Sequence, residues 1–131
     1  MNEFIHLHNH THYSLLDAAC TPSQLAKAAA ADGQKACALT DHGVMFGSLE
    51  FFTKCKDNGI KPIIGYEAYV ANGSRFDRTA GKAGTKKKNY FHLVLLAKNE
   101  IGYRNLIKLT SLGNLEGYYY KPRIDEELLE R

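Results

Sequence analysis

Segments with the pattern of a β-strand alternate with segments patterned as a helix along most of this chain. Strands are predicted at residues 4–9, 35–40, 60–71 and 90–97, and a helix is predicted after the first, second and fourth of them. Strands that alternate with helices normally pair in parallel through right-handed crossovers. The chain is therefore predicted to form an α/β fold with parallel strands and flanking helices, either an open doubly wound sheet or part of a (β/α) barrel.

Capping signals place the helix ends. Thr21 is the predicted N-cap of the first helix, with Pro22 at the first helical position, Gln24 completing a capping box and Gly33 ending the helix. The other helices are predicted to start from the turn 41–43, from Asn99 and from Asp125, and the second to end at residues 58–59.

The length constrains the barrel alternative. A closed (β/α) barrel usually needs about 250 residues, whereas this chain has 131 residues and four predicted strands. We therefore expect residues 1–131 to be the N-terminal portion of a larger domain, with open strand edges that lead either to self-association or to a disturbed C-terminal segment.

Composition places the chain among ordinary globular proteins, with 44% hydrophobic and 24% charged residues. No apolar stretch approaches the roughly 20 residues needed to cross a bilayer, and residues 1–9 lack the pattern of a signal peptide. We expect a cytoplasmic protein without a membrane partner. Its three cysteines (Cys20, Cys37 and Cys55) are odd in number and lack metal-site spacing, so they are predicted to be reduced.

The positive charge is concentrated in one loop. Residues 72–89 contain six basic residues and one acidic residue, which leaves 11 basic and 13 acidic residues elsewhere. The loop is either a DNA-phosphate contact or a solvated surface segment. The basic residues predicted to contact nucleic acid are Arg75, Arg78, Lys86, Lys87 and Lys88, with Lys82 between them.

Four of the six histidines lie between His6 and His12, and Asp17 follows closely. The period of a strand places alternate imidazoles on one face, where their nitrogens can converge on a metal ion. A polar strand face exposed to water is the alternative, and for a single His-x-His pair it is the favoured one.

Three further segments carry ligand-type side chains on or beside predicted strands. These are Thr40-Asp41-His42-Gly43, Gly65-Tyr66-Glu67 and Phe91-His92-Leu93. Taken singly, His42 could cap a helix, Glu67 could be a charge on an edge strand, and His92 could be a core histidine. Because parallel α/β folds assemble their sites at strand ends, the combination predicts a metal site.

These motifs resemble those of the polymerase and histidinol phosphatase (PHP) superfamily, in which His8-x-His10 with Asp17, the Thr40–Gly43 segment and Gly65-x-Glu67 have counterparts. The longer context, including residues 7–18, 59–70, 74–78 and 92–106, is similar to the N-terminal PHP domain of bacterial replicative DNA polymerases. The resemblance covers essentially the whole chain. It implies a distorted seven-stranded (β/α) barrel, of which this chain would be the N-terminal part, with up to three metal ions.

Carried over residue by residue, the resemblance implies a set of metal ligands for Zn, Mn or Fe. It also implies that Asp41 orients His42, that His10, Asp41 and His42 are catalytic, and that the family's remaining ligands lie beyond Arg131. His92 fits least well, since it lies near the start of its predicted strand. The implied metal ligands are His8, His10, Asp17, His42, Glu67 and His92.

Such a centre is suited to phosphoester hydrolysis, because divalent ions activate water and stabilise charge on a phosphoryl group. The resemblance implies a 3′–5′ exonuclease acting on DNA, in a polymerase whose nucleotide addition resides in other domains. The expected partners are DNA, those domains and a proofreading subunit. The alternatives are a metal-braced scaffold that docks the proofreading subunit, and a stand-alone PHP phosphatase. Tyr118, Tyr119 and Tyr120 are predicted to pack against the barrel wall, with base stacking as the alternative.

Overall fold

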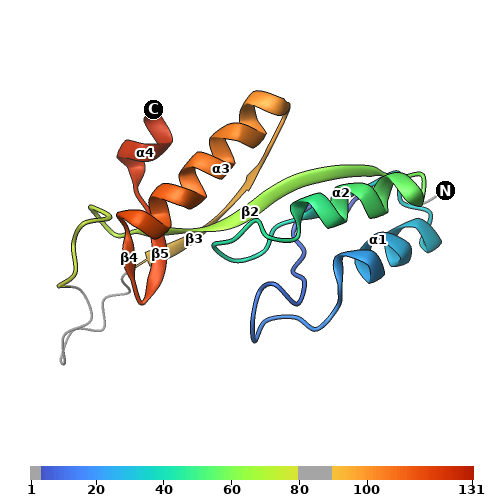
Figure 1. Ribbon diagram of the computed structural model, residues 1–131, viewed down its shortest axis with the longest axis horizontal. Helices are drawn as coiled ribbons and strands as arrows, with labels where there is room; N and C mark the ends of the chain where they lie inside the picture. Colours follow the sequence, from blue (N-terminus) through green and yellow to red (C-terminus); the bar gives the residue numbers. More distant parts are fainter. Residues whose placement is uncertain (1–3, 80–89) are drawn as a thin grey trace.

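The computed structural model describes residues 4–79 and 90–131, which form a mixed α/β fold with one long central strand (Figure 1). The lysines at 82 and 86–88 therefore lie outside the described residues. The elements in chain order are α1 (Pro22–Ala31), β1 (Ala36–Leu39), α2 (Ser48–Asp57), β2 (Lys61–Ala71), β3 (Tyr90–Leu96), α3 (Glu100–Leu115), β4 (Tyr118–Tyr119), β5 (Lys121–Ile124) and α4 (Glu126–Glu130).

Strand β2 organises the sheet, because β1, β3 and β5 all pair with it. β1 runs parallel to its first half at residues 61–64, and β5 runs parallel at Tyr69 and Val70. β3 runs antiparallel along residues 65–71, and β4 closes a hairpin with β5. Within the described residues the strands form an open sheet, so a closed barrel is not observed.

The prediction that all strands pair in parallel is wrong for β3. A parallel pair requires a crossover, usually through a helix, whereas an antiparallel strand needs only a returning loop. No helix is predicted between β2 and β3, and the chain returns antiparallel there. The β4–β5 hairpin was not predicted at all, since its strands are only two and four residues long. Two of its tyrosines, Tyr118 and Tyr120, are exposed instead of packed.

The segment 4–9 is not a regular strand, contrary to prediction, although it lies beside β1. Ala38 N donates to His6 O at 3.0 Å and Thr40 N donates to Asn9 O at 2.9 Å. The donors are two residues apart and the acceptors three, so the segment contains one residue too many for a regular ladder. The Asn9 side-chain amide donates to Ala38 O at 3.0 Å and thereby takes the place of a backbone N–H.

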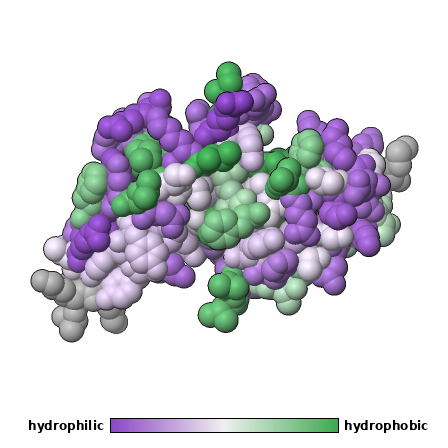
Figure 2. Space-filling view, in the orientation of Figure 1, coloured by the Kyte–Doolittle hydropathy of each residue, from purple (hydrophilic) through white to green (hydrophobic). Residues whose placement is uncertain are grey.

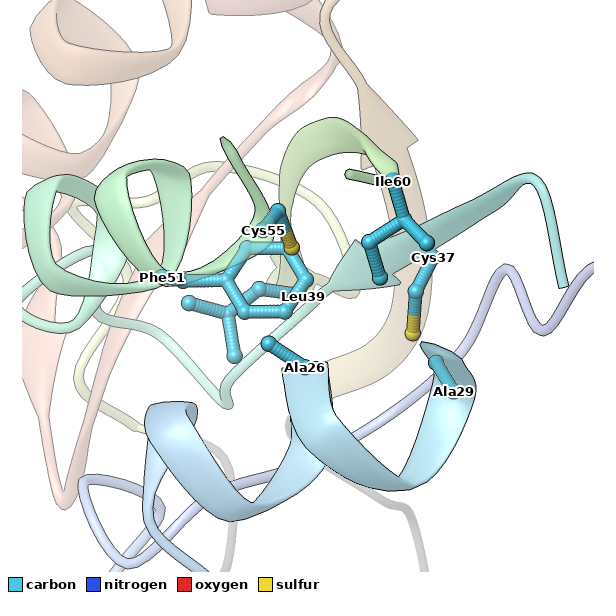
Figure 3. Packing of buried hydrophobic residues seen from close by; sticks show 7 residues of the cluster. All are labelled: Ala26, Ala29, Cys37, Leu39, Phe51, Cys55 and Ile60. Atoms are coloured by element: carbon cyan, nitrogen blue, oxygen red, sulfur yellow. The ribbon is translucent and has the colours of Figure 1, made fainter. Parts of the chain in front are cut away.

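Two apolar cores lie at opposite ends of β2. In the first, α1 and α2 pack around β1 through Phe51, Leu39 and Ile60, together with the buried thiols Cys37 and Cys55 (Figure 3). Burial raises the pKa of the Cys37 thiol to about 11 and that of Cys55 to about 12. All three cysteines are free, as predicted. The Thr21–Gln24 capping box forms as predicted and fixes the start of α1 in this core.

The second core joins β2 to the C-terminal elements. Tyr66 and Ala68 pack with Leu106 of α3, Ile124 of β5 and Leu128 of α4. Side chains alternate across a strand, so this packing directs Glu67 and Tyr69 to the opposite face of β2. The start of α3 at Asn99 and that of α4 at Asp125 agree with the prediction.

The second helix begins later than predicted. α2 starts at Ser48, and the preceding turn remains beside β2, where Glu67 N donates to Asp41 O at 3.0 Å and Gly43 N donates to Glu67 O at 2.8 Å. The backbone of this turn is therefore committed to β2 and cannot form helical hydrogen bonds. This contact extends the pairing of β1 and brings His42 next to Glu67.

Apolar residues also gather on the surface, across the middle of the face shown in Figure 2. A groove of about 740 Å³ lies between α2, the start of β2 and the start of α3, and is lined by residues that include Leu49, Phe52 and Tyr103. The groove is at the amino end of β2, away from Glu67. No helix among the described residues is long and apolar enough to cross a membrane.

Candidate metal centre

Four imidazoles converge on the carboxylate of Glu67, whose side chain is only 6% exposed. On Glu67 Oε2 the distances are 2.5 Å to His8 Nε2, 3.0 Å to His10 Nε2 and 3.1 Å to His42 Nε2. On Oε1, His92 Nδ1 lies at 2.8 Å. Oε2 therefore faces three histidines and Oε1 faces one.

Different backbone pairings and hydrogen bonds bring these side chains to the centre. Glu67 and His42 are neighbours because the turn after β1 pairs with β2. His92 is opposite Tyr69 in the antiparallel register, so it lies on the face of β2 that carries Glu67. His8 and His10 come from the segment held against β1 by Asn9.

The antiparallel pairing of β3 also accounts for the position of His92. In a parallel sheet the start of this strand would lie at the end of the sheet opposite to Glu67. Reversal of β3 places its first residues beside the last residues of β2. His92 therefore reaches the cluster because β3 runs antiparallel to β2, and not parallel as predicted.

The donor set fits divalent metal ions. The ligand atoms of His8, His10 and Glu67 lie within 4.8 Å of one another, as do those of His42, Glu67 and His92. The two triads share Glu67. Every ion-pair partner of Glu67 among the described residues is a histidine, with no lysine or arginine. Imidazole nitrogen with carboxylate oxygen is a donor set typical of Zn, Mn and Fe sites.

The charges within the cluster are coupled. Burial acts to raise the pKa of Glu67, but the hydrogen bond with His8 and the charges of His42, His8 and His92 outweigh it and lower the pKa. Burial and the neighbouring His42 lower the pKa of His10. An ionised carboxylate beside a neutral imidazole is the protonation state that metal ligation requires.

Asp17, expected to be a metal ligand, contacts His42. Its Oδ2 lies 2.6 Å from His42 Nδ1, on the opposite side of the ring from the nitrogen that faces Glu67. Asp17 is outside both triads within the described residues. A carboxylate bound to the second nitrogen of a histidine orients the ring and increases the basicity of the ligating nitrogen.

Asp41, expected to orient His42, is bound to Thr11. Asp41 Oδ1 accepts from Thr11 N at 2.5 Å and Oδ2 accepts from Thr11 Oγ1 at 2.8 Å. Both residues are buried. Asp41 therefore fixes the segment that follows His10, and its expected contact with His42 is replaced by the one from Asp17.

Two contributors to the cluster were not predicted. Ser14 Oγ accepts from His42 N at 2.7 Å and lies 3.3 Å from His10 Nδ1, so it links two of the imidazole-bearing segments. The ring of Tyr69 stacks on His42 at a centroid distance of 5.6 Å. Tyr69 follows Glu67 by two residues, so the strand period alone could have identified it, whereas no sequence signal marks Ser14.

The two described basic residues that were expected to contact DNA, Arg75 and Arg78, differ in their exposure. Arg75 is buried: its Nη1 lies 2.9 Å from Asp125 Oδ1 and its Nε lies 2.7 Å from Glu116 Oε2. Arg75 is therefore paired with carboxylates inside the fold and is not exposed to contact DNA phosphates, contrary to the prediction. Arg78 remains exposed, with a hydrogen bond to Glu116 O at 3.4 Å.

The PHP domain family matches residues 6–131 of the chain. Related sequences include DNA polymerase III subunit alpha of Treponema pallidum, which is 56% identical over 126 residues, and that of Thermus aquaticus, which is 53% identical over 129 residues. The protein of the same name from Borreliella burgdorferi is 51% identical over 130 residues. These alignments cover 96%, 97% and 99% of this chain, but the chain spans only about a tenth of each relative.

Solved structures with a similar fold are more distant in sequence. An amidohydrolase from Chromobacterium violaceum has a TM-score of 0.55 and 24% identity, with 86% of this chain and 34% of that chain covered. A protein assigned as a metal-dependent phosphoesterase from Bifidobacterium adolescentis has a TM-score of 0.51 and 20% identity, with 80% and 32% covered. These likenesses concern the fold. Since the family match extends over nearly all of the sequence, the chain belongs to the PHP domain family.

Proposed function

We propose that the chain is the PHP domain of a DNA polymerase III alpha subunit and that its histidine cluster is a metal-dependent phosphodiesterase site acting as a 3′–5′ exonuclease on DNA. The observation that carries the proposal is the convergence of four imidazoles on the buried Glu67. The similarity to polymerase subunits over nearly the whole chain supports DNA as the substrate and the other polymerase domains as partners. Replication of DNA would take place in the cytoplasm.

His8 and His10 would hold one ion with Glu67, and His42 and His92 would hold a second with the same carboxylate. Divalent ions, whether Zn, Mn or Fe, supply an activated water and charge stabilisation to in-line displacement at phosphorus. Glu67 belongs to both triads: its Oε2 faces His8, His10 and His42, and its Oε1 faces His92. Ligands beyond Arg131 would complete the centre.

The remaining polar residues would position these ligands. Asp17 binds the second nitrogen of His42 and keeps its Nε2 directed at Glu67. Asp41 acts on His10 through Thr11, which makes it a positioning residue. His10 and His42 are the residues in this chain that we assign to catalysis.

DNA contacts outside the centre would come from the basic loop. Arg78 is the exposed described residue of that group, and Lys82, Lys86, Lys87 and Lys88 are its other basic residues besides Arg75. Such contacts would weaken as salt rises, because binding releases counterions from the strand.

A second candidate function is a metal-braced scaffold. The cluster ties together the N-terminal segment, the turn before α2, β2 and β3, so bound metal would cross-link parts of the fold that are distant in sequence. In that case the domain would dock a proofreading subunit without performing hydrolysis. A stand-alone phosphatase is a weaker alternative, given the polymerase relatives.

The test is cleavage of 5′-labelled and 3′-labelled single-stranded DNA by the full-length protein that carries this sequence, with Mn²⁺. His10→Ala should abolish stepwise removal of 3′ nucleotides and leave nucleotide addition intact. His12→Ala is the matched control, because His12 is in neither triad. Bound metal without His10-dependent cleavage would select the scaffold.

A further inference from the structure

The β4–β5 hairpin brings a lysine to the edge of the metal centre. Lys121 Nζ lies 5.4 Å from the ring centroid of Tyr69. That ring stacks on His42 and lies edge-on to His92, with centroids 5.2 Å apart. Lys121 is therefore one side chain away from two of the metal-binding imidazoles.

The hairpin is held in this place by close packing. A Cβ on Gly43 would lie 2.9 Å from Pro122 Cγ and 2.9 Å from Tyr69 Cε2, so only a glycine beside His42 allows this approach. Arg123 pairs with Tyr69, and Lys121 precedes it by two residues on the same face of the strand. The backbone fixes Lys121 toward the part of β2 that carries Glu67.

Lys121 has no carboxylate partner among residues 4–79 and 90–131. Its ammonium lies over the ring of Tyr69, whereas other basic residues near the hairpin are paired, Arg75 with three carboxylates and Arg123 with backbone carbonyls. Lys121 thus presents an exposed ammonium without a counter-charge beside a site proposed to act on negatively charged substrates. Such a group is suited to binding an anionic group of the substrate.

Its position indicates which anion. Lys121 contacts neither Glu67 nor any histidine of the triads, so it is beside the centre and not within it. A phosphate bound at the two triads would be separated from the Lys121 ammonium by the Tyr69 ring. The next phosphate along a nucleic acid strand would be offset from the first in this manner.

We propose that the Lys121 ammonium binds the phosphate adjacent to the one that is cleaved, which gives the centre its preference for a nucleic acid strand over a small phosphoester. The assignment rests on the proposed function. Lys121 would contribute to substrate binding through charge alone, as a specificity residue, and would hold no metal.

The experiment compares two substrates of the full-length protein with Mn²⁺: a single-stranded oligonucleotide, and the p-nitrophenyl ester of thymidine 5′-monophosphate, which has one phosphodiester and no neighbouring phosphate. Lys121→Met should raise KM for the oligonucleotide by about tenfold with little change in kcat, and should leave KM for the ester unchanged. It should also reduce the slope of log kcat/KM against log salt by about 0.7, the value for one phosphate contact on a single strand.

Lys121→Arg should restore the oligonucleotide KM to within a few fold, since it keeps the charge. Lys61→Met, at the other end of β2, is the matched control and should change neither substrate. Equal losses on both substrates would overturn the assignment in favour of a structural role at Tyr69, and so would an unchanged oligonucleotide KM. Absence of cleavage by the unmodified protein would overturn the proposed function together with this assignment.

Discussion

Glu67 and His92 are diagonal neighbours on one face of the β2–β3 ladder, with His92 Nδ1 2.8 Å from Glu67 Oε1. Glu67 is directly opposite Val94, and His92 precedes Val94 by two residues. This antiparallel register is what adds a histidine to the second triad. It also assigns His92 to one of the two triads and not to the other.

Loss of His92 should therefore affect one metal position selectively. We expect His92→Ala to lower the bound metal by about one equivalent, because the triad of His8, His10 and Glu67 remains complete. Metal content after gel filtration measures the change. Val94→Ala, in the same strand, is the control. Loss of all metal from His92→Ala would show that the triads are not separate.

Asp41 should influence metal affinity without contacting the metal. Asp41→Asn removes the charge that holds both the backbone and the hydroxyl of Thr11, and should weaken Mn²⁺ binding by about 10- to 100-fold. Thr11→Val keeps the backbone bond and should weaken binding less. Calorimetric titration with Mn²⁺ ranks the two variants. An Asp41→Asn protein with unchanged affinity would refute the positioning role.

Gly43 should tolerate no side chain. Its φ of +66° disfavours other residues, and a Cβ would approach Pro122 and Tyr69 to 2.9 Å. Gly33→Ala is the matched control, because Gly33 has a φ of +77° and nothing within 4 Å of the added carbon. Gly33→Ala should cost about 1 kcal/mol of stability, the cost of the positive φ, and Gly43→Ala should cost more. Equal losses in urea unfolding would argue against close packing of the hairpin.

The buried Asp125–Arg75 pair should make stability depend on pH in the acid range. Burial acts to raise the pKa of Asp125, but the backbone and side-chain hydrogen bonds from Arg75 outweigh it and lower the pKa. A carboxyl whose pKa is lower in the folded state stabilises the protein above its unfolded pKa of about 3.9, and this contribution is lost as pH falls through the folded value. Stability should therefore decline below about pH 4.

Asp125→Asn should remove part of that acid dependence and should cost less at neutral pH than the about 3–5 kcal/mol of a fully broken buried pair, since Glu116 and Glu127 still pair with Arg75. Asparagine can still cap α4, so the loss reports on the charge. Denaturant unfolding between pH 3 and pH 7 measures both effects. Glu130→Gln, an exposed carboxylate in α4, is the control. An unchanged pH profile for Asp125→Asn would contradict this account.

Sequence patterns predicted the parts of the fold that local interactions determine. The capping box at Thr21 and the starts of α3 and α4 are correct because they depend on a few adjacent residues. Strand direction depends on tertiary pairing, so β3 was predicted in the wrong orientation. The irregular pairing at Asn9 was not predicted either, because there a side-chain amide replaces a backbone N–H donor of the ladder.

The candidate site was also predicted only in part. His8, His10, His42, Glu67 and His92 were identified by residue type and motif, and they do come together. The polar contacts that orient them were assigned less well, since the carboxylate on the second nitrogen of His42 is that of Asp17, whereas Asp41 binds Thr11. Arg75 could not be recognised as buried, because its partners Glu116 and Asp125 are distant in sequence.

The central claim is that Glu67 is the shared ligand of a metal centre. The most direct measurement is the metal content and Mn²⁺ affinity of the full-length protein and its Glu67→Gln variant, with Glu50→Gln, a half-buried carboxylate in α2 outside both triads, as the matched control. The account predicts that Glu67→Gln loses metal at both triads, with an affinity reduced more than tenfold, while Glu50→Gln binds as the unmodified protein does. Undiminished metal binding by Glu67→Gln would contradict the account.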